Sequence, residues 1–538
     1  MALISAERIL INGNILTMES GSPRATALAI KGDRILFVGN DRDALELKGV
    51  YTEIIDLDGR TAIPGLIESH AHPLIYAKQL LGVKCDGEAT RSINNIIENL
   101  AEVVSRTPEG QWVIGWGWDD SKFAERRNLT RWDLDRVSPK NPVILSRGCG
   151  HIVVANSLAL SMSNITRDTQ DPFGGHIAKD PDTGEPTGIL QEDAQKLLPV
   201  ISYGVSEYKR GMALAQQEFH RRGITTVNDM TAQPDGMRIY QQILKEGHLQ
   251  TRIRMWPTAD TVTIFKGMLD GLSELGFESG FGSDMINIQG IKFVLDGSMA
   301  GKTAAIDGLY EGETEQLGIL YYTQEDLNRR VLKCFESGFR VSVHGIGQRA
   351  IEQALNAIEE AENKTGFVGK RNKIEHCSVP NDDQIERIKK LDIVVGSSIG
   401  FIYFIGGAYY YNLGQERINK AFPQRTYIDK GICAPGNSDC PVCDINPMWG
   451  IYGAVTRNTM SGHNMGMDEC ITPMEALRAY TIDAAYSNYD EGIIGSLKEG
   501  KYADIAVLDQ DPTKIDPEQL KDITVAITIM NGEVVYKV

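Results

Sequence analysis

Short apolar runs alternate with longer amphipathic segments through the middle of the chain. Apolar runs of about four to eight residues are typical of buried strands, whereas apolar positions at helical spacing are typical of amphipathic helices. The alternation favours a mainly parallel sheet with helices between its strands. The predicted strands are 65–72, 223–229, 252–256, 290–296, 340–344, 373–376, 392–397 and 431–439, and the predicted helices include 208–222, 324–337, 348–362 and 382–390. Eight strands close a (β/α)8 barrel of the TIM type, so we expect an α/β fold of this class.

The two ends of the chain show a different pattern, with short strands and tight turns. The pair Asn531-Gly532 is a strong signal for a type I′ hairpin turn between two such strands. Neither end has enough strands to enclose a core by itself. We therefore expect one small β-sandwich built from residues 1–60 plus 490–538, with the barrel formed by residues 61–489 inserted into it.

One connection between predicted barrel strands is too long to be an unstructured loop. Residues 76–205 separate the first predicted strand from the helix before the second. Structureless loops of that length are not expected in a compact domain. The segment has apolar strands of its own at 112–115 and 142–146, and a hairpin-like stretch at 175–185. We interpret it as an inserted subdomain that caps the mouth of the active site, because it leaves from the C-terminal end of a strand.

Composition and charge exclude several classes of function. The chain has 538 residues, of which 42% are hydrophobic and 24% charged, and its net charge is −17. This acidity argues against nucleic acid or an anionic membrane as a partner. The sequence contains neither a long apolar run nor a signal peptide, so a cytoplasmic location is expected. The pair Cys440 and Cys443 has redox or zinc spacing, but the second pair that a zinc ribbon needs is missing from the sequence.

Ionisable side chains collect at the ends of the predicted strands, where barrels of this class have their active sites. The first strand ends at His70 and His72, whose spacing points both side chains to one side of the sheet. The fifth and sixth strands end at His344 and His376, and the eighth ends at Asp439. Imidazole is the commonest metal ligand, so this clustering predicts a metal site. Each histidine could instead be a core residue, and Asp439 could cap a helix.

Lys292 is unusual because it interrupts the apolar run of the fourth predicted strand. A buried lysine is costly unless it is paired or neutral. Burial lowers its pKa, and the free amine can then react with carbon dioxide to give a carbamate that bridges two cations. The alternative is a salt bridge to Asp296 or to a neighbouring carboxylate.

Several motifs in a fixed order resemble the amidohydrolase superfamily and, within it, amidohydrolase family 3, which includes N-substituted formamide deformylases. The resemblance covers nearly the whole chain. The motifs that carry it are the run 57–73, Lys292-Phe-Val-Leu-Asp-Gly-Ser298, His344-Gly-Ile-Gly347, Ile374-Glu-His376 and Ser438-Asp-Cys-Pro-Val442. Two departures are visible at the pocket rim. Asn437 stands where glycine is common, and Ser397-Ser398 replaces a polar residue followed by proline. These departures concern the substrate rather than the binding of metal.

The resemblance implies a centre of two divalent cations. One cation would be held by His70, His72 and Asp439, the other by His344 and His376, with carboxylated Lys292 and a hydroxide between them. Two zinc ions per chain are expected first, because an imidazole-rich site with few carboxylates suits zinc, while iron, nickel, cobalt and manganese remain open.

The implied activity is hydrolysis of a C–N bond in a small molecule, namely an amide, an N-formyl group or a cyclic amide. The attacking group would be a metal-activated hydroxide, and Asp439 would carry the proton to the leaving nitrogen. A deaminase and an ester or lactone hydrolase are alternatives on the same site. A non-catalytic scaffold on this fold is a further alternative, which is disfavoured because every candidate ligand is present.

Further candidates for substrate binding lie in the insertion and after the seventh strand. They are Trp116, Trp118, Asp119, His151 and Tyr403. The first four could instead be packing residues of the insertion. Tyr403 belongs to an aromatic run at 401–411. As loop aromatics these residues could line an apolar pocket, and they could equally bury a helix or form a contact in a homodimer.

Overall fold

The computed structural model describes residues 5–85, 90–118, 120, 123–147, 152–199, 203–261 and 265–538. The chain has an α/β fold that divides into two compact units. The larger unit contains Met1–Pro73 and Gln216–Val538, and the smaller one contains Leu74–Ala215.

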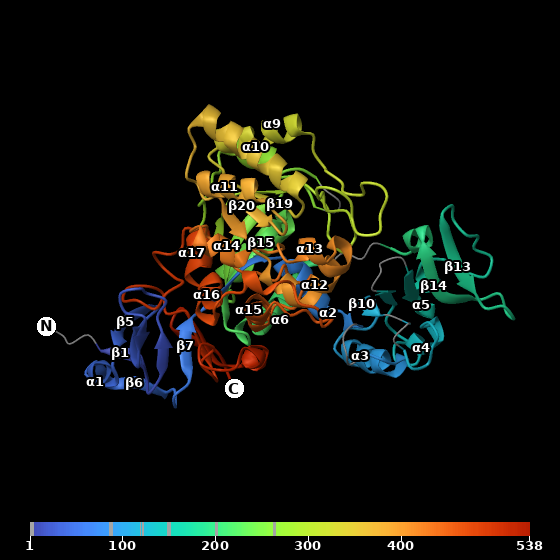
Figure 1. Cartoon of the computed structure of the whole chain (residues 1–538). Helices are drawn as coiled ribbons and strands as arrows, with labels where there is room; N and C mark the ends of the chain where they lie inside the picture. Colours follow the sequence, from blue (N-terminus) through green and yellow to red (C-terminus); the bar gives the residue numbers. More distant parts are fainter. Residues whose placement is uncertain are drawn as a thin grey trace. The chain divides into compact units, whose positions relative to one another are not determined.

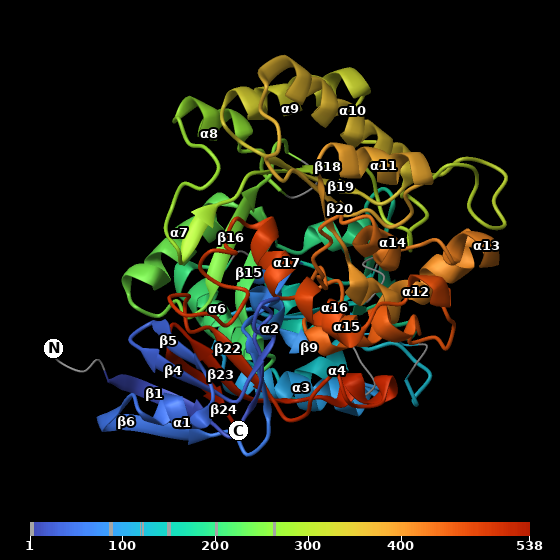
Figure 2. The ribbon, with the colours of Figure 1, turned by 60° about the vertical axis from the view of Figure 1, so that its left-hand side comes forward.

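The N-terminal end of the chain contributes strands to two sheets of the larger unit, and the C-terminal end contributes strands to one of them (Figure 1). One sheet has the order β5-β4-β1-β6 and consists of β1 (Ala6–Ile11), β4 (Ala27–Lys31), β5 (Arg34–Gly39) and β6 (Lys48–Asp56). The other has the order β24-β23-β22-β7-β2-β3 and consists of β2 (Asn14–Leu16), β3 (Arg24–Ala25), β7 (Thr61–Pro64), β22 (Ile505–Leu508), β23 (Val525–Met530) and β24 (Glu533–Lys537). Figure 2 shows the C-terminal strands in red beside β4 and β5. Leu28 and Val507 belong to one buried cluster, so the two sheets share a core.

The other strands of this unit form two parallel sheets of four. The first has the order β17-β16-β15-β8, with β8 (Leu66–Ala71), β15 (Ile224–Ala232), β16 (Arg252–Pro257) and β17 (Ile286–Ile288). The second has the order β18-β19-β20-β21, with β18 (Ile291–Val294), β19 (Val341–Gly345), β20 (Lys373–His376) and β21 (Val394–Gly396). Their residues are nearly all buried, as expected for strands of parallel sheets covered on both faces.

Isolated parallel bridges connect these two sheets. Thr258 pairs with Lys292, Ser397 with Gly436, and Ala71 with Cys440. The segment before Cys440 therefore lies between β21 and β8. The predicted strand over 431–439 is wrong as a regular strand, because this segment forms only isolated bridges. Proline at 435 and 441 removes two of the backbone donors that a regular ladder needs.

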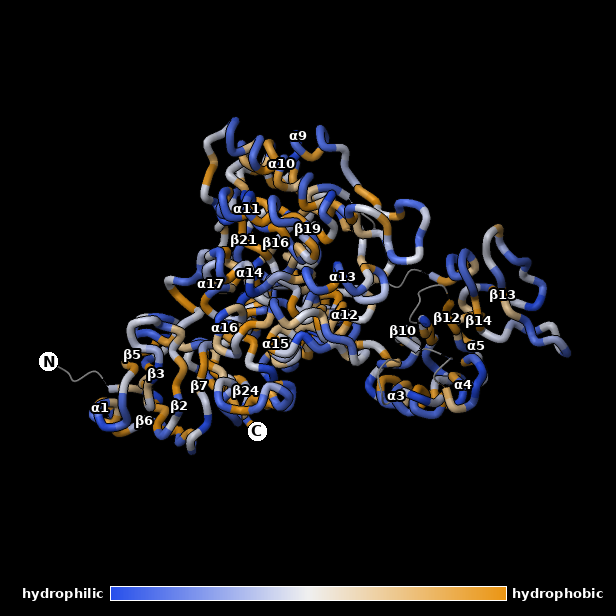
Figure 3. The backbone as a smooth tube through the Cα atoms, viewed as in Figure 1, coloured by the Kyte–Doolittle hydropathy of each residue, from blue (hydrophilic) through white to orange (hydrophobic). Residues whose placement is uncertain are grey.

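Helices connect and surround the parallel strands. They are α6 (Val205–His220), α7 (Pro234–Lys245), α8 (Leu269–Glu274), α9 (Gln324–Glu336), α10 (Gln348–Thr365), α11 (Asp382–Lys390), α12 (Ile399–Leu413), α13 (Gln415–Ile418), α14 (Gln424–Asp429), α15 (Pro447–Thr456), α16 (Pro473–Ala479) and α17 (Ile482–Ser487). Local sequence fixes several of their ends: α11 begins with a capping box between Asn381 and Gln384, and α10 ends at Gly366, which is left-handed with φ 70°. Figure 3 shows hydrophobic colour on the central strands and hydrophilic segments on helices such as α11.

The residues of the aromatic run 401–411 form part of α12 rather than a loop, and Phe401 and Tyr409 are buried, which agrees with the helix alternative. The run is apolar on nearly every side, so it lacks the amphipathic spacing that marks a helix in sequence. Among the described residues, none of the helices combines the length and the apolar character needed to cross a membrane.

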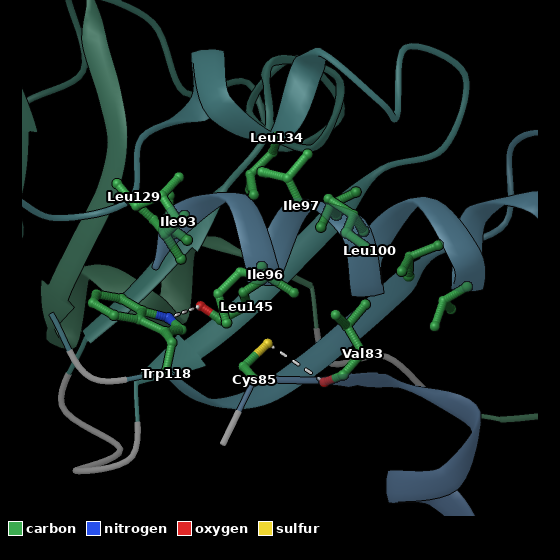
Figure 4. Packing of buried hydrophobic residues seen from close by; sticks show 14 of the residues in the cluster. Val83, Cys85, Ile93, Ile96, Ile97, Leu100, Trp118, Leu129, Leu134 and Leu145 are labelled. Atoms are coloured by element: carbon green, nitrogen blue, oxygen red, sulfur yellow. Dashed lines mark hydrogen bonds between the residues drawn. The ribbon is translucent and has the colours of Figure 1, made fainter. Parts of the chain in front are cut away.

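The smaller unit has a six-stranded sheet of its own, in the order β13-β14-β12-β11-β10-β9. Its strands are β9 (Val83–Lys84), β10 (Val113–Trp118), β11 (Val143–Arg147), β12 (Ile152–Ala155), β13 (Gly175–Lys179) and β14 (Pro186–Glu192), and its helices include α2 (Pro73–Leu81), α3 (Ile93–Ser105), α4 (Arg131–Asp135) and α5 (Ser157–Met162). Figure 4 shows Ile96 and Leu100 of α3 packed with Leu145 and Trp118 of the sheet. That this unit caps an active site stays a prediction.

Candidate functional site

Three ligand-type side chains converge at the C-terminal end of β8. The Nε2 atoms of His70 and His72 lie 3.3 Å and 3.0 Å from Oδ1 of Asp439. Among the described residues, these three form a group whose potential ligand atoms all lie within 4.8 Å of one another. The two imidazoles and one carboxylate are the donor types that zinc and similar cations prefer.

Backbone pairing between β8 and the segment at Cys440 produces this convergence. The Asp439 N–H donates to the His70 carbonyl at 3.0 Å, and the His72 N–H donates to the Cys440 carbonyl at 2.8 Å. Glu68, which is fully buried, accepts hydrogen bonds from the Ser438 N–H and hydroxyl, each at 3.0 Å. Burial raises the pKa of Glu68 to about 8. Hydrogen bonds therefore join β8, which carries the two histidines, directly to the segment that carries Asp439.

The Nδ1 atom of each of these histidines, which faces away from Asp439, has a hydrogen-bond partner. Nδ1 of His70 lies 2.8 Å from Oε2 of Glu375, and Nδ1 of His72 lies 2.8 Å from Oγ1 of Thr231. Burial opposes the ionisation of Glu375, but Lys373 at 2.9 Å and His70 outweigh it and hold the pKa of this carboxyl well below its usual range. The carboxylate fixes Nδ1–H on His70 and leaves Nε2 facing Asp439.

In Asp439, as in Glu375, neighbouring charged or polar groups outweigh burial and favour the ionised carboxylate. Its burial opposes the charged form, but the neighbouring imidazoles of His70 and His72 lower the pKa of this carboxyl well below its usual range. The Oδ1 atom is buried and makes no hydrogen bond of good geometry with the described residues. Asp439 therefore has an acceptor oxygen available for a cation or a proton.

His344 and His376 lie next to this group. Their ring centroids are 4.5 Å apart, and the rings of His70 and His376 are 4.8 Å apart. Nδ1 of His376 lies 2.8 Å from the Ser398 hydroxyl, and Nε2 of His344 lies 3.1 Å from the Gly297 carbonyl. Burial and the neighbouring imidazoles hold the pKa of His376 well below its usual range, so its ring is neutral, as a metal ligand must be.

Lys292 lies on β18, two residues before the residue that pairs with His344. It is 2% exposed, and burial lowers its pKa to about 8. Its Nζ has no hydrogen-bond partner among the described residues, so the alternative salt bridge to Asp296 is absent there. Asp296 instead accepts backbone N–H groups, including those of Ala305 and Gly347, each at 2.9 Å. The buried amine of Lys292 and the buried Oδ1 of Asp439, neither of which makes a hydrogen bond of good geometry with the described residues, fit a site built to hold cations.

Two of the candidate ligands have left-handed backbones. The φ angle is 66° at His376 and 55° at Asp439. Residues with a Cβ rarely adopt this conformation, and where they do so the cost is met by surrounding structure, commonly at functional sites.

The predicted substrate-binding residues have varied surroundings. Trp116 is 47% exposed, whereas Trp118 is fully buried and donates its Nε1–H to the Leu145 carbonyl at 3.1 Å, so its indole offers no surface to a ligand. Asp119 and His151 lie outside the described residues. Tyr403 stacks on Trp449, with ring centroids 4.5 Å apart.

Sequence reasoning assigned no ligand-supporting role to the residues that contact the candidate ligands, although it noted Ser398 and the aromatic run that contains Phe401. Phe401 of α12 stacks on His376 with ring centroids 5.4 Å apart. The Nδ1 atoms of His70, His72 and His376 are hydrogen-bonded to Glu375, Thr231 and Ser398, respectively. Glu375 stood beside a predicted ligand in the motif Ile374-Glu-His376, which is a usable signal. Thr231 gave no such signal.

A cavity of about 930 Å³ lies elsewhere in the larger unit and contains none of the candidate ligands. Its lining includes Asp392, Val394 and Cys433. These residues lie at or near the N-terminal start of β21 and of the segment that leads to Cys440, away from the strand ends that carry the candidate ligands. The C-terminal ends of the parallel strands, rather than this cavity, carry the candidate chemistry.

Comparisons with known proteins find similar chains and a similar fold. The family model described as the amidohydrolase family matches residues 53–536. YtcJ of Bacillus subtilis (strain 168), provisionally named as an amidohydrolase, is 32% identical over 539 residues, covering 98% of this chain and 98% of that protein. The N-substituted formamide deformylase of Arthrobacter pascens is 27% identical over 538 residues, with 98% of each chain covered. The crystal structure of an uncharacterized metal-dependent hydrolase from Pyrococcus furiosus superposes with a TM-score of 0.75 at 27% identity, covering 94% of this chain and 100% of that one.

Proposed function

The chain belongs to the amidohydrolase family and is a metal-dependent hydrolase of that superfamily, and we propose that it cleaves a C–N bond in an amide, N-formyl or cyclic amide substrate. The observation that carries the proposal is the convergence of His70, His72 and Asp439 beside the buried, unpaired amine of Lys292. The similarity to a formamide deformylase over nearly the whole chain favours this reaction class over others.

We propose a closed (β/α)8 barrel as the scaffold. Support comes from the parallel bridges Thr258–Lys292, Ser397–Gly436 and Ala71–Cys440, which connect the two sheets of four on both sides. In such a barrel all candidate ligands belong to one rim, where active sites of this class form.

The donor set fits two divalent cations, with zinc as the first choice. One would be held by His70, His72 and Asp439, and the other by His344 and His376, with Lys292 between them as a carbamate. The carbamate forms when the neutral amine bonds to the carbon of CO2 and its proton leaves to solvent. When bound, such cations lower the pKa of water and polarise a carbonyl group.

The residues of this chain would move the proton that hydrolysis requires. Asp439, ionised and with a free Oδ1, would accept a proton from the attacking water and deliver it to the leaving nitrogen. Glu68 and Ser438 would hold that carboxylate in position, because they bond the backbone on either side of it. Phe401 would provide an apolar wall behind His376.

One observation separates this proposal from a deaminase with a single cation. Such an enzyme has no use for a buried lysine, whereas Lys292 lies without a partner among the described residues, within electrostatic reach of Glu375 and Asp439. An ester or lactone hydrolase would use the same two-cation site. Only an assay distinguishes cleavage of a C–N bond from cleavage of an ester C–O bond.

The test is elemental analysis of the full chain, purified without chelators, followed by assays on matched substrates. We expect about two cations per chain and turnover of N-formyl, N-acyl or cyclic amide substrates. Oxygen esters with the same acyl and leaving groups are the control and should be poorer substrates. One cation per chain, or hydrolysis of the esters alone, would contradict the proposal.

A further inference from the structure

The hydroxyl of Ser398 bonds two buried side chains instead of capping its own helix. Ser398 occupies the N-cap position of α12, where a serine side chain ordinarily accepts a backbone N–H of the first turn. Here it makes no such bond. Its Oγ instead lies 2.8 Å from Nδ1 of His376 and donates to Oδ1 of Asn437, also at 2.8 Å. All three side chains are buried.

The directions of these two bonds determine where the proton of His376 sits. A hydroxyl has one hydrogen to donate. Since Ser398 gives that hydrogen to the carbonyl oxygen of Asn437, its oxygen can only accept from His376. Nδ1 must then carry the ring proton, and Nε2 keeps its lone pair.

We propose that Ser398 and Asn437 are positioning residues that hold His376 in the Nδ1–H tautomer, so that Nε2 is the ligand for the second cation. This inference rests on the proposed two-cation site. It concerns His376, whose Nδ1 faces a hydroxyl, whereas Nδ1 of His70 faces the carboxylate of Glu375.

A further observation supports the pairing of Ser398 with Asn437. Backbone hydrogen bonds link the two segments on either side of Ser398, because the Asn437 N–H donates to the Ser397 carbonyl at 3.2 Å and the Gly400 N–H donates to the Asn437 carbonyl at 3.1 Å.

The neighbouring serine provides a matched control. Ser397 is equally buried, and its Oγ has no hydrogen-bond partner among the described residues. Ser398→Ala and Ser397→Ala remove the same atom from adjacent positions, but only the first removes the link to His376. Asn437→Leu breaks the link from its other end, and Asn437→Asp keeps an acceptor for the Ser398 hydroxyl.

The experiment is NMR of the metal-free full chain with ¹⁵N-labelled histidine, with the His376 signals assigned from His376→Gln. We expect Nδ1–H in the wild type, Ser397→Ala and Asn437→Asp, and loss of this single tautomer in Ser398→Ala and Asn437→Leu. Titration with Zn²⁺ should show the second binding step weakened by about 10- to 100-fold in the latter two variants. Ser398→Thr, which restores a hydroxyl, should restore both readouts.

An unchanged tautomer in both Ser398→Ala and Asn437→Leu would overturn the inference, and so would an equal effect of Ser397→Ala. Neither measurement uses a substrate. Failure to hydrolyse amides would therefore contradict the proposed function while leaving this inference intact, and an unchanged tautomer would do the reverse.

Discussion

The two halves of the candidate centre differ in how complete they are. The ligand atoms of His70, His72 and Asp439 already converge, whereas among the described residues no comparable group forms around His344 and His376. The second half includes Lys292, whose free amine is not an anionic ligand. Folding alone thus assembles the first half, because the carboxylate is supplied by the chain. The second half depends on a carboxylate that would be made from carbon dioxide.

The largest effect is expected from Asp439→Asn. The amide keeps an oxygen near the cation of the first half but cannot accept a proton, so turnover should fall by about 10²- to 10⁴-fold. Steady-state kinetics with metal content measured on the same sample would check this. Asp444→Asn changes an exposed carboxylate five residues away and should leave turnover as in the wild type. Full activity of Asp439→Asn would remove the proton-transfer role.

Lys292→Met tests the dependence of the second half on the lysine. Methionine has similar volume and no amine, so the carbamate cannot form. We expect the metal content to fall from about two cations per chain to about one, with the first half retaining its own. Elemental analysis after dialysis measures this, and Lys389→Met, at an exposed lysine, is the control. Two cations in Lys292→Met would show that the halves do not differ in this way.

Glu375→Gln tests how much the buried ion pair between Lys373 and Glu375, next to His70, contributes to the free energy of unfolding. The variant leaves the buried ammonium of Lys373 without its partner, which typically costs about 3–5 kcal/mol in the free energy of unfolding. Urea denaturation of the metal-free protein measures the change. Glu359→Gln, which breaks more exposed ion pairs with Arg387 and Lys390, should cost no more than about 1 kcal/mol. Similar losses in the two variants would argue against a special role for Glu375.

The smallest effect is expected from Thr231→Val, which removes the partner of Nδ1 of His72 without changing volume much. The side chain of His72 is 16% exposed, so water can replace the lost hydroxyl. We expect the first cation to bind about 10-fold more weakly, at the low end of effects from residues behind a ligand. A Zn²⁺ titration checks this, and a loss approaching 100-fold would contradict the expectation that water replaces the hydroxyl of Thr231.

Much of the strand pattern could be predicted from sequence because local rules determine it. The predicted strand 373–376 and the predicted helix 382–390 coincide with β20 and α11, where apolar runs and a capping box mark the ends. The aromatic run could not be assigned correctly, because α12 is apolar on almost every face and its burial depends on distant segments. The segment before Cys440 was predicted as a regular strand, since sequence alone does not show that this segment forms only isolated bridges.

The candidate histidines and Asp439 could be picked out from sequence because each stands at the end of a predicted strand, and Lys292 because it interrupts an apolar run. Their partners could not, because those contacts join residues far apart in the chain. Glu375 and His70 are separated by 305 positions, and Thr231 and His72 by 159. Nothing local to Ser398 indicates that its hydroxyl faces an imidazole instead of its own helix.

The backbone bonds that join His70 to Asp439 and His72 to Cys440 have a consequence for biosynthesis. Synthesis proceeds from the N-terminus, so both imidazoles leave the ribosome some 370 residues before the carboxylate that completes their site. A nascent chain has no finished pocket until that late segment has emerged and docked. Loading of the proposed site with a divalent cation would therefore be an event of the released or nearly released polypeptide, and fragments that stop short of this point should bind no cation there.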